Sequence, residues 1–196
     1  MKDNIIPFLR EDEGTPLPLS DEAIARACST GDAAAITILF ERFNPNVARY
    51  ISRLLGTFDV DDLVQATFLE VLRGKTQYDG RASVTTWLFA IATNIVRHHR
   101  RTDNRKLRLM AAISRDIKSP SRDASHNLDS ARQLERVRAL LLELSDTQRE
   151  AFVLCILEGY SAREAAQVLG TSEAAVWKRV CKARAKIRGR ILEETP

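Results

Sequence analysis

Hydrophobic residues recur every three or four positions along most of this chain, a period that predicts a series of amphipathic helices. The longest stripe lies between Asp32, a residue type that caps helix starts, and Gly56, a residue type that ends helices. Pro45 falls inside this expected helix and predicts a kink there. The apolar positions of the stripe are Ile36, Leu39, Phe40, Phe43, Val47, Tyr50, Ile51 and Leu54.

Three more helices are expected in the first half of the chain. Ser20 and the two acidic residues after it suit a helix start, because acids favour the positive end of the helix dipole, and this helix should stop at Gly31. A further helix is expected over 59–73, and Ser83 can cap one that runs to about Arg101. The last of these helices has an apolar stripe, and Trp87 is interpreted as part of that core. The stripe comprises Val84, Trp87, Leu88, Ile91 and Ile95.

The helical pattern gives way after residue 101 to a stretch rich in Asp, Asn, Arg, Ser and Pro. We interpret 102–128 as a flexible linker, in which a helical turn or two can persist over 107–113. Fully extended, this linker would reach about 90 Å. The chain is therefore predicted to be all-α, with a loose tail over 1–19 and two small helical domains over 20–101 and 129–196.

The second domain opens with another helical stripe. A capping box at 145–148 then introduces a helix over 150–158, which should end before Gly159. The four positions of the stripe are expected to face one core. They are Leu134, Val137, Leu141 and Leu144.

The end of the chain has the pattern of a helix-turn-helix. Ser161 and Glu164 form a capping box that predicts a short helix over 162–169. Gly170 supplies the conformational freedom for a tight turn, and either of the next two residues can cap the following helix. This second helix should pack through a stripe made of Val176, Val180, Ala183 and Ile187.

Positive charge is concentrated on the second helix of this motif. Over 172–190 seven cations face a single acid, Glu173, which gives a net charge of +6. Neutralisation of phosphates by such a helix favours binding to duplex DNA, whereas the charge run alone would be consistent with a merely solvated surface. The cations are Lys178, Arg179, Lys182, Arg184, Lys186, Arg188 and Arg190.

Composition agrees with a folded helical protein that binds an acidic partner. The 196 residues include only eight glycines and six prolines, and the net charge of +4 conceals a second basic segment over 97–108 in an otherwise acidic chain. The three cysteines form no C-x-x-C pair, and neither a signal peptide nor a transmembrane segment is evident, so a reduced cytoplasmic protein without membrane insertion is expected. The cysteines are Cys28, Cys155 and Cys181.

No catalytic or metal-binding pattern accompanies these features. His98 and His99 are adjacent and therefore point to different helix faces, and His126 stands apart from other metal-ligand types. The sequence also lacks a phosphate-binding glycine-rich loop and a nucleophile elbow. We expect no metal, no cofactor and no enzymatic activity.

Several motifs closely resemble those of extracytoplasmic-function (ECF) bacterial sigma factors. Conserved region 2 of that family is similar to the run over 59–69, followed by Tyr78-Asp-Gly-Arg-Ala-Ser83 and Thr86-Trp-Leu88 with Asn94 and Arg100-Arg101. Region 4 is similar to Leu144-Ser-Asp-Thr-Gln-Arg-Glu-Ala-Phe152, Glu158-Gly-Tyr-Ser161 and the helix-turn-helix. The resemblance covers about 21–191, with the motifs in the family's order.

This resemblance implies an alternative sigma factor, a dissociable subunit that binds core RNA polymerase and recruits it to promoter DNA. It would recognise minus-35 and minus-10 elements and promote opening of the duplex. An anti-sigma factor is implied as a further partner. The residues matching the segment that docks on polymerase are Asp61, Asp62, Gln65 and Glu70.

The resemblance also assigns two DNA-binding surfaces. Tyr78 would offer a stacking face to an unstacked minus-10 base, and Gly80 would allow close backbone approach. The minus-10 residues are Gln77, Tyr78, Asp79, Gly80, Arg81, Asn94, Arg97, His98 and Arg101. The minus-35 residues are Ser172, Glu173, Trp177, Lys178, Arg179, Cys181 and Lys182.

The sequence departs from the family at Trp177, where a basic residue is common, and at Lys178, where a small polar one is common. Two other functions are open to the residues alone. One is a DNA-binding regulator whose first domain senses a ligand or protein, and the other is a helical nucleic-acid enzyme. The docking segment, loop and basic helix of the first domain favour the sigma factor over a sensor, and the missing catalytic cluster disfavours the enzyme.

Overall fold

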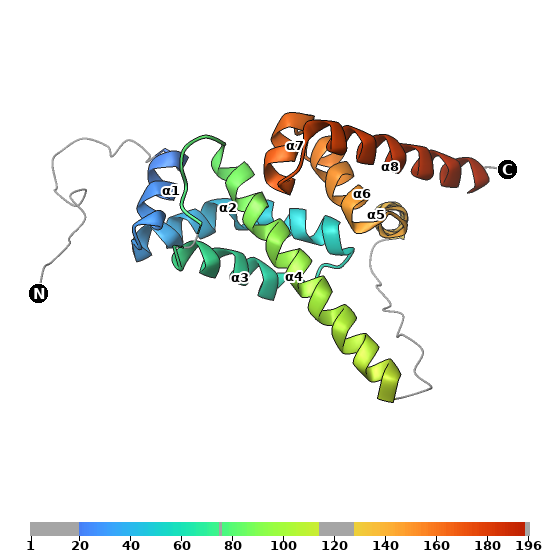
Figure 1. The fold of residues 1–196 in the computed structure, drawn as a ribbon, viewed down its shortest axis with the longest axis horizontal. Helices are drawn as coiled ribbons and strands as arrows, with labels where there is room; N and C mark the ends of the chain where they lie inside the picture. The colour runs from blue at the N-terminus through green and yellow to red at the C-terminus, as the bar shows by residue number, and fades with distance from the viewer. Residues whose placement is uncertain (1–19, 75, 114–127, 195–196) are drawn as a thin grey trace, which may run out of the picture.

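The computed structural model describes residues 20–74, 76–113 and 128–194 (Figure 1). Every regular element within these residues is helical, which confirms the all-α prediction for the described part of the chain. The tail expected over 1–19 and the middle of the expected linker, 114–127, lie outside it.

The first domain is built around its longest early helix, α2, against which the other three helices pack. Its core is apolar and includes a stacked pair of rings, Tyr50 and Phe89, with centroids 4.1 Å apart. Burial of these side chains supplies the main driving force for assembly of the helices. The four helices are α1 (Asp21–Ser29), α2 (Ala33–Leu55), α3 (Asp61–Leu72) and α4 (Val84–Ile113).

The helix ends follow the capping residues read from the sequence. The Ser20 hydroxyl accepts a hydrogen bond from the amide of Ala23 at 3.2 Å, and Asp32 Oδ1 accepts one from the amide of Ala34 at 2.9 Å. Gly56 ends α2 in the left-handed region, with φ of 69°. Each contact satisfies a backbone group at a helix end or fixes the turn that follows, so these predicted ends are confirmed.

Helix α4 is longer than expected, because it continues to Ile113 and does not stop near Arg101. The segment 102–113 contains neither proline nor glycine, so nothing in it breaks a helix. As helix, these residues span about 18 Å, less than half their extended reach. The predicted end of this helix was therefore wrong, and the domain limits remain a prediction.

The second domain combines four α-helices with one π-helical turn. The helix expected over 150–158 begins earlier, at Asp146, and its last turn is the π-helix η1 (Val153–Leu157). The α-helices are α5 (Leu128–Glu143), α6 (Asp146–Phe152), α7 (Ala162–Leu169) and α8 (Glu173–Glu194).

The helix-turn-helix prediction is confirmed by α7 and α8. The amide of Ser161 donates to Glu164 Oε2 at 2.9 Å, and the amide of Glu164 donates to the Ser161 hydroxyl at 3.2 Å. Gly170 adopts φ of 63°, and Ser172 caps α8 by accepting from the amide of Ala175 at 3.2 Å. The turn is thus set by local sequence.

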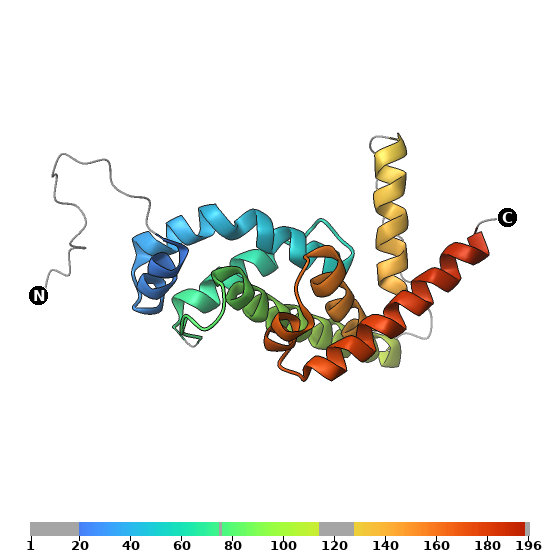
Figure 2. The ribbon, with the colours of Figure 1, turned by 90° about the horizontal axis from the view of Figure 1, so that it is seen from above.

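The stripe expected to bury α5 is only half correct. Leu141 and Leu144 are buried, but Leu134 is 58% exposed and Val137 47% exposed. Helix α5 reaches the rest of the molecule mainly through its carboxyl-terminal end (Figure 2). The part of α5 that contains Leu134 and Val137 is therefore less covered than the sequence pattern indicates.

The two domains pack directly against each other. Helix α7 lies along α4, and α5, α6 and η1 contact α2 (Figures 1 and 2). At the centre of this interface the ring of Tyr160 stacks on Phe89 with centroids 5.8 Å apart, extending the core pair of the first domain into the second. The helix-turn-helix is thereby held beside the basic helix of the first domain.

Gly56 offers a test of this packing, because a Cβ atom added there would lie 2.8 Å from the side chain of Leu142 in the second domain. We expect Gly56→Ala to lower the unfolding free energy by clearly more than the ~1–2 kcal/mol of left-handed strain. Gly74→Ala is the matched control, since Gly74 has φ of 67° and open space around it. Thermal and urea unfolding would measure both variants. Equal losses would contradict the close approach of Leu142.

Candidate nucleic-acid interface

The amino-terminal half of α8 presents the predicted minus-35 residues on an exposed surface. Val176, Val180 and Ala183 are buried and fix this helix against the rest of the second domain. Of the predicted contact residues, six are exposed and Arg179 is half-buried. The exposed ones are Ser172, Glu173, Trp177, Lys178, Cys181 and Lys182.

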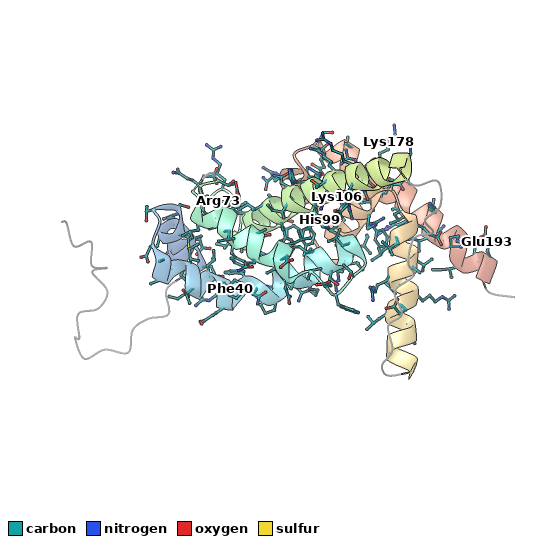
Figure 3. All side chains as sticks on the ribbon, turned by 90° about the horizontal axis from the view of Figure 1, so that it is seen from below. Phe40, Arg73, His99, Lys106, Lys178 and Glu193 are labelled. Carbon is teal, nitrogen blue, oxygen red and sulfur yellow. The ribbon has the colours of Figure 1, made fainter. Side chains whose placement is uncertain are left out.

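Most cations of α8 are available to an outside partner. Only two of the seven bind elsewhere in the described chain: Lys186 donates to the carbonyl of Glu143 at 2.5 Å, and Arg190 pairs with the carboxylates of Glu143 and Glu193. The other five form no ion pair with a described residue. Figure 3 shows Lys178 at the outer edge of the molecule.

Trp177 is the unusual member of this surface, because its large side chain is 53% exposed. An exposed indole among cations can contact a thymine methyl group or a sugar, and it does not contribute to the buried stripe of α8. The departure from the family pattern noted in the sequence is therefore a surface feature.

The loop predicted to bind the minus-10 element is mostly exposed, with one exception. Gln77, Asp79, Gly80 and Arg81 face solvent. Tyr78 is only 7% exposed, its hydroxyl donates to the carbonyl of Ala82 at 2.7 Å, and its ring lies 5.4 Å from that of Trp87. The expectation that Tyr78 offers a free stacking face is wrong for this conformation, because its ring completes the core beneath the loop.

Trp87 lies in the core, as the sequence pattern predicts, with 8% exposure. Its indole N–H has no hydrogen-bond partner among the described residues.

Helix α4 separates its predicted minus-10 residues into two groups. Asn94, His98 and Arg101 are spaced at four and three positions and are all exposed. Arg97 instead turns toward the second domain, where it holds Glu150 through two hydrogen bonds: Nε to Oε1 at 3.0 Å and Nη2 to Oε2 at 2.7 Å. Arg97 is therefore not free to bind DNA in this structure.

The Glu150 carboxylate was not among the residues singled out from the sequence. Its side chain is fully buried, and its hydrogen bonds raise the pKa of the Arg97 guanidinium, which favours the charged form of that arginine. A glutamate within a short helix offers no local signal for a partner 53 positions away. Only the packing of α6 against the first domain brings these two groups together.

Three of the four predicted polymerase-docking residues, Asp61, Asp62 and Gln65, line an apolar groove beside α3, and Glu70 does not. Asp61, Asp62 and Gln65 are exposed, whereas Glu70 is half-buried and pairs with Arg73 at 3.3 Å. Sequence reasoning missed the apolar part of this surface, because Phe40 and Leu72 were expected to pack inward and Leu69 was assigned to no surface. These exposed apolar residues are Phe40, Leu69 and Leu72.

Within the described residues no group of three or more histidine, cysteine or acidic side chains could hold a metal ion. None of the described helices has the length and apolar character needed to span a bilayer. The described residues thus present three candidate surfaces: a cationic helix, a loop with an exposed helix face, and a polar edge with two carboxylates beside an apolar groove.

Such an arrangement defines a two-domain, all-helical DNA-binding protein, and comparison with known families makes the class specific. Residues 39–106 match the model of Sigma-70 region 2, and residues 134–187 match that of Sigma-70 region 4. The chain belongs to the extracytoplasmic-function group of the sigma-70 family, and it is an alternative sigma factor of transcription initiation. This membership decides against a regulator that never joins polymerase.

Relatives extend over nearly the whole chain. The RNA polymerase sigma factor NccH of Alcaligenes xylosoxydans xylosoxydans is 34% identical over 179 residues, which cover 87% of this chain and 94% of NccH. The ECF RNA polymerase sigma factor SigC of Mycobacterium tuberculosis is 30% identical, with 83% of this chain and 86% of SigC covered.

Solved structures show the same fold. A structure of CnrH in complex with the cytosolic domain of CnrY is similar, with a TM-score of 0.65, 29% identity, and coverage of 89% of this chain and 99% of that one. The sigma factor RpoE of Bartonella quintana, solved with the anti-sigma factor NepR, gives a TM-score of 0.63 at 23% identity, covering 80% of this chain and 96% of RpoE.

The three cysteines differ enough in their surroundings to predict selective labelling. Cys28 is fully buried, and burial raises the pKa of its thiol to about 11, while burial also raises the pKa of Cys155. Because the thiolate is the reactive form, both should react slowly near neutral pH, and exposed Cys181 should react first. Mass spectrometry after brief maleimide treatment would identify the modified residue. Preferential labelling of Cys28 would contradict its burial.

Proposed function

We propose that this sigma factor recognises the minus-35 element through the amino-terminal half of α8. The observation that carries this proposal is the set of exposed side chains in the first turns of α8, the helix that Ser172 caps. An arginine or lysine there can contact guanine O6 and N7, and the helix amino terminus can hold a phosphate. The proposed contact residues are Ser172, Glu173, Trp177, Lys178, Arg179, Cys181 and Lys182.

The minus-10 element is assigned to the loop over 77–81 together with the exposed face of α4. Asn94 can hydrogen-bond base edges, and Arg101 and His98 lie along the same face for contacts to the backbone. Two members of this site need a conformational change before they can bind. Tyr78 must leave its place against Trp87, and Arg97 must leave Glu150.

Core polymerase is proposed to dock on α3. The polar edge formed by Asp61, Asp62 and Gln65 suits pairing of its two carboxylates with basic side chains, and the adjoining apolar groove suits burial of hydrophobic ones. A surface of this mixed kind is typical of a protein partner and unlike the cationic face of α8.

Three broader assignments accompany these sites. An anti-sigma factor is proposed as a partner, because the similar chains CnrH and RpoE were each solved with a second protein, and RpoE's partner is named an anti-sigma factor. The protein is proposed to act in the cytoplasm, where bacterial polymerase and promoters are found. It works through binding and has no catalytic activity or cofactor of its own.

Removal of single cations from α8 tests the minus-35 assignment. We expect Lys178→Ala and Arg179→Ala each to weaken promoter binding by the holoenzyme about tenfold or more, since a good base contact contributes ~1–3 kcal/mol. Arg188→Ala is a matched control, because Arg188 also lies on α8 and forms no ion pair with a described residue. Fluorescence anisotropy with promoter DNA would give the affinities. Loss of polymerase binding by folded Lys178 or Arg179 variants would contradict this division of labour.

A charge reversal on α3 tests the docking surface. We expect Asp62→Arg to lower the affinity for core polymerase at least tenfold, because an exposed acid would be replaced by a like charge facing the partner's basic groups. Glu193→Arg, at the far end of α8, makes the same change of charge away from α3. Titration of core enzyme with labelled sigma factor at two salt concentrations would measure the effect. Unchanged affinity for Asp62→Arg would reject this contact.

A further inference from the structure

The groove between α2 and α3 presents large apolar side chains that no described residue covers. Phe68 lines this groove and is 4% exposed, and the ring of Phe40 meets it edge-on with centroids 5.0 Å apart. Phe40, Leu69 and Leu72 also line it and are 37%, 45% and 42% exposed. Its volume of about 580 Å³ lies within the range of natural binding pockets. Apolar side chains gathered at one exposed place are typical of a binding surface.

Two carboxylates line the same groove. Asp61 and Asp62 are both exposed, and neither forms an ion pair with a described residue. A segment that combines apolar side chains with a cation would therefore complement both the groove and its two carboxylates.

The start of the chain has this combination. Residues 5–9 are Ile5-Ile-Pro-Phe-Leu9, which we call the apolar run, and Arg10 follows directly. The apolar run precedes α1 and lies outside the described residues. The three acids at 11–13 belong to the stretch that leads from Arg10 to α1, so they need not lie against Asp61 and Asp62.

The chain enters α1 close enough to the groove for the apolar run to reach it. Asp21, the first residue of α1, pairs with Arg42 on α2 at 2.5 Å. Arg42 lies between Phe40 and Asn44 along α2, and both of these residues line the groove. Residues 10–19 can span about 33 Å when extended, whereas a helix with its side chains is about 10–12 Å across. This stretch is therefore long enough to cross α2.

We propose that the apolar run occupies the groove between α2 and α3 in the free sigma factor, with Arg10 facing Asp61 and Asp62, and that core polymerase must displace it. A short tether keeps the effective concentration of the run on the order of millimolar, so weak contacts suffice. The competition rests on the proposed docking of polymerase on α3, whereas occupation of the groove does not. The apparent affinity for polymerase is lowered by the fraction of molecules whose groove is filled.

Paramagnetic broadening of NMR signals tests occupation of the groove without polymerase. The spin label would be attached to an introduced cysteine, Arg73→Cys, next to groove residue Leu72, in a Cys155→Ser, Cys181→Ser background that keeps buried Cys28. The amide signals of Ile5, Ile6 and Leu9 should be strongly broadened in the chain with an unaltered apolar run.

Two glutamate substitutions make this measurement specific. Phe8→Glu should restore the three signals, because a carboxylate is costly to bury among apolar side chains. Thr15→Glu adds the same charge outside the apolar run and should leave the broadening unchanged. Equal broadening in the Phe8→Glu and unaltered chains, or no broadening in the unaltered chain, would overturn occupation of the groove.

A mixed sample shows whether each groove is filled by its own chain. Spin-labelled chains without isotope would be mixed with isotope-labelled chains that carry no spin label. The signals of the apolar run should stay sharp in this mixture. Broadening there would show that a second copy supplies the run, which would overturn the proposal.

Titration of core polymerase measures the competition. Phe8→Glu should raise the affinity for core enzyme about fivefold, because the groove is then free, and Thr15→Glu should leave it unchanged. If Phe8→Glu restores the NMR signals but does not change the affinity, the competition is overturned and docking of polymerase on this groove is disfavoured, while occupation stands. If the groove proves empty, the Asp62→Arg titration still decides the docking surface.

Discussion

The carbonyl end of α2 is the point on which the arrangement of the two domains depends. The carbonyl of Leu54 accepts from Arg149 at 2.9 Å and from Arg100, and the carbonyl of Gly56 accepts from Arg138 at 3.2 Å. These arginines come from α4, α5 and α6, so three helices meet on the negative end of one helix dipole. Arg149 also binds carbonyls at the end of α5, and its burial together with the nearby charge of Arg100 lowers its pKa. The second domain is thereby oriented on α2 before any side-chain carboxylate is considered.

Features of the structure could be predicted from the sequence when the interacting residues are close together along the chain, and not when they are far apart. The ends of α1, α2 and α7 were predicted well, because each cap joins residues within four positions of one another. The pair of Arg97 with Glu150 and the exposure of Leu134 could not be predicted, since both depend on which helices become neighbours. The end of α4 was missed for another reason. Its polar composition indicates a linker, but helix propensity decides continuation once no proline or glycine intervenes.

The fold shows that the acidic residues of the chain also pair with its arginines. Basic segments over 97–108 and 172–190 indicate nucleic acid, and the acidic remainder suggests only solubility. In the folded chain two of these acidic residues have specific partners, because Glu150 and Glu158 form ion pairs with arginines of the first domain. The cations of α8 largely escape such pairing. The two proposed DNA-binding surfaces therefore differ in availability: the minus-35 face is open, whereas Arg97 of the minus-10 face is paired with Glu150.

The difference between the exposed face of α8 and the partly paired face of α4 is consistent with the different forms of DNA that the two faces are proposed to bind. The proposed minus-35 face of α8 would meet intact duplex, whose groove is present before binding, so an exposed and preformed helix suffices. The proposed minus-10 surface would bind a strand that becomes accessible only when the duplex opens, whereas a guanidinium that contacts phosphates alone binds any duplex. Pairing of Arg97 with an internal carboxylate makes DNA compete for this contact, and the burial of Tyr78 adds a second cost. Because both costs must be offset before the proposed minus-10 surface can bind, this surface discriminates against partners that make few contacts.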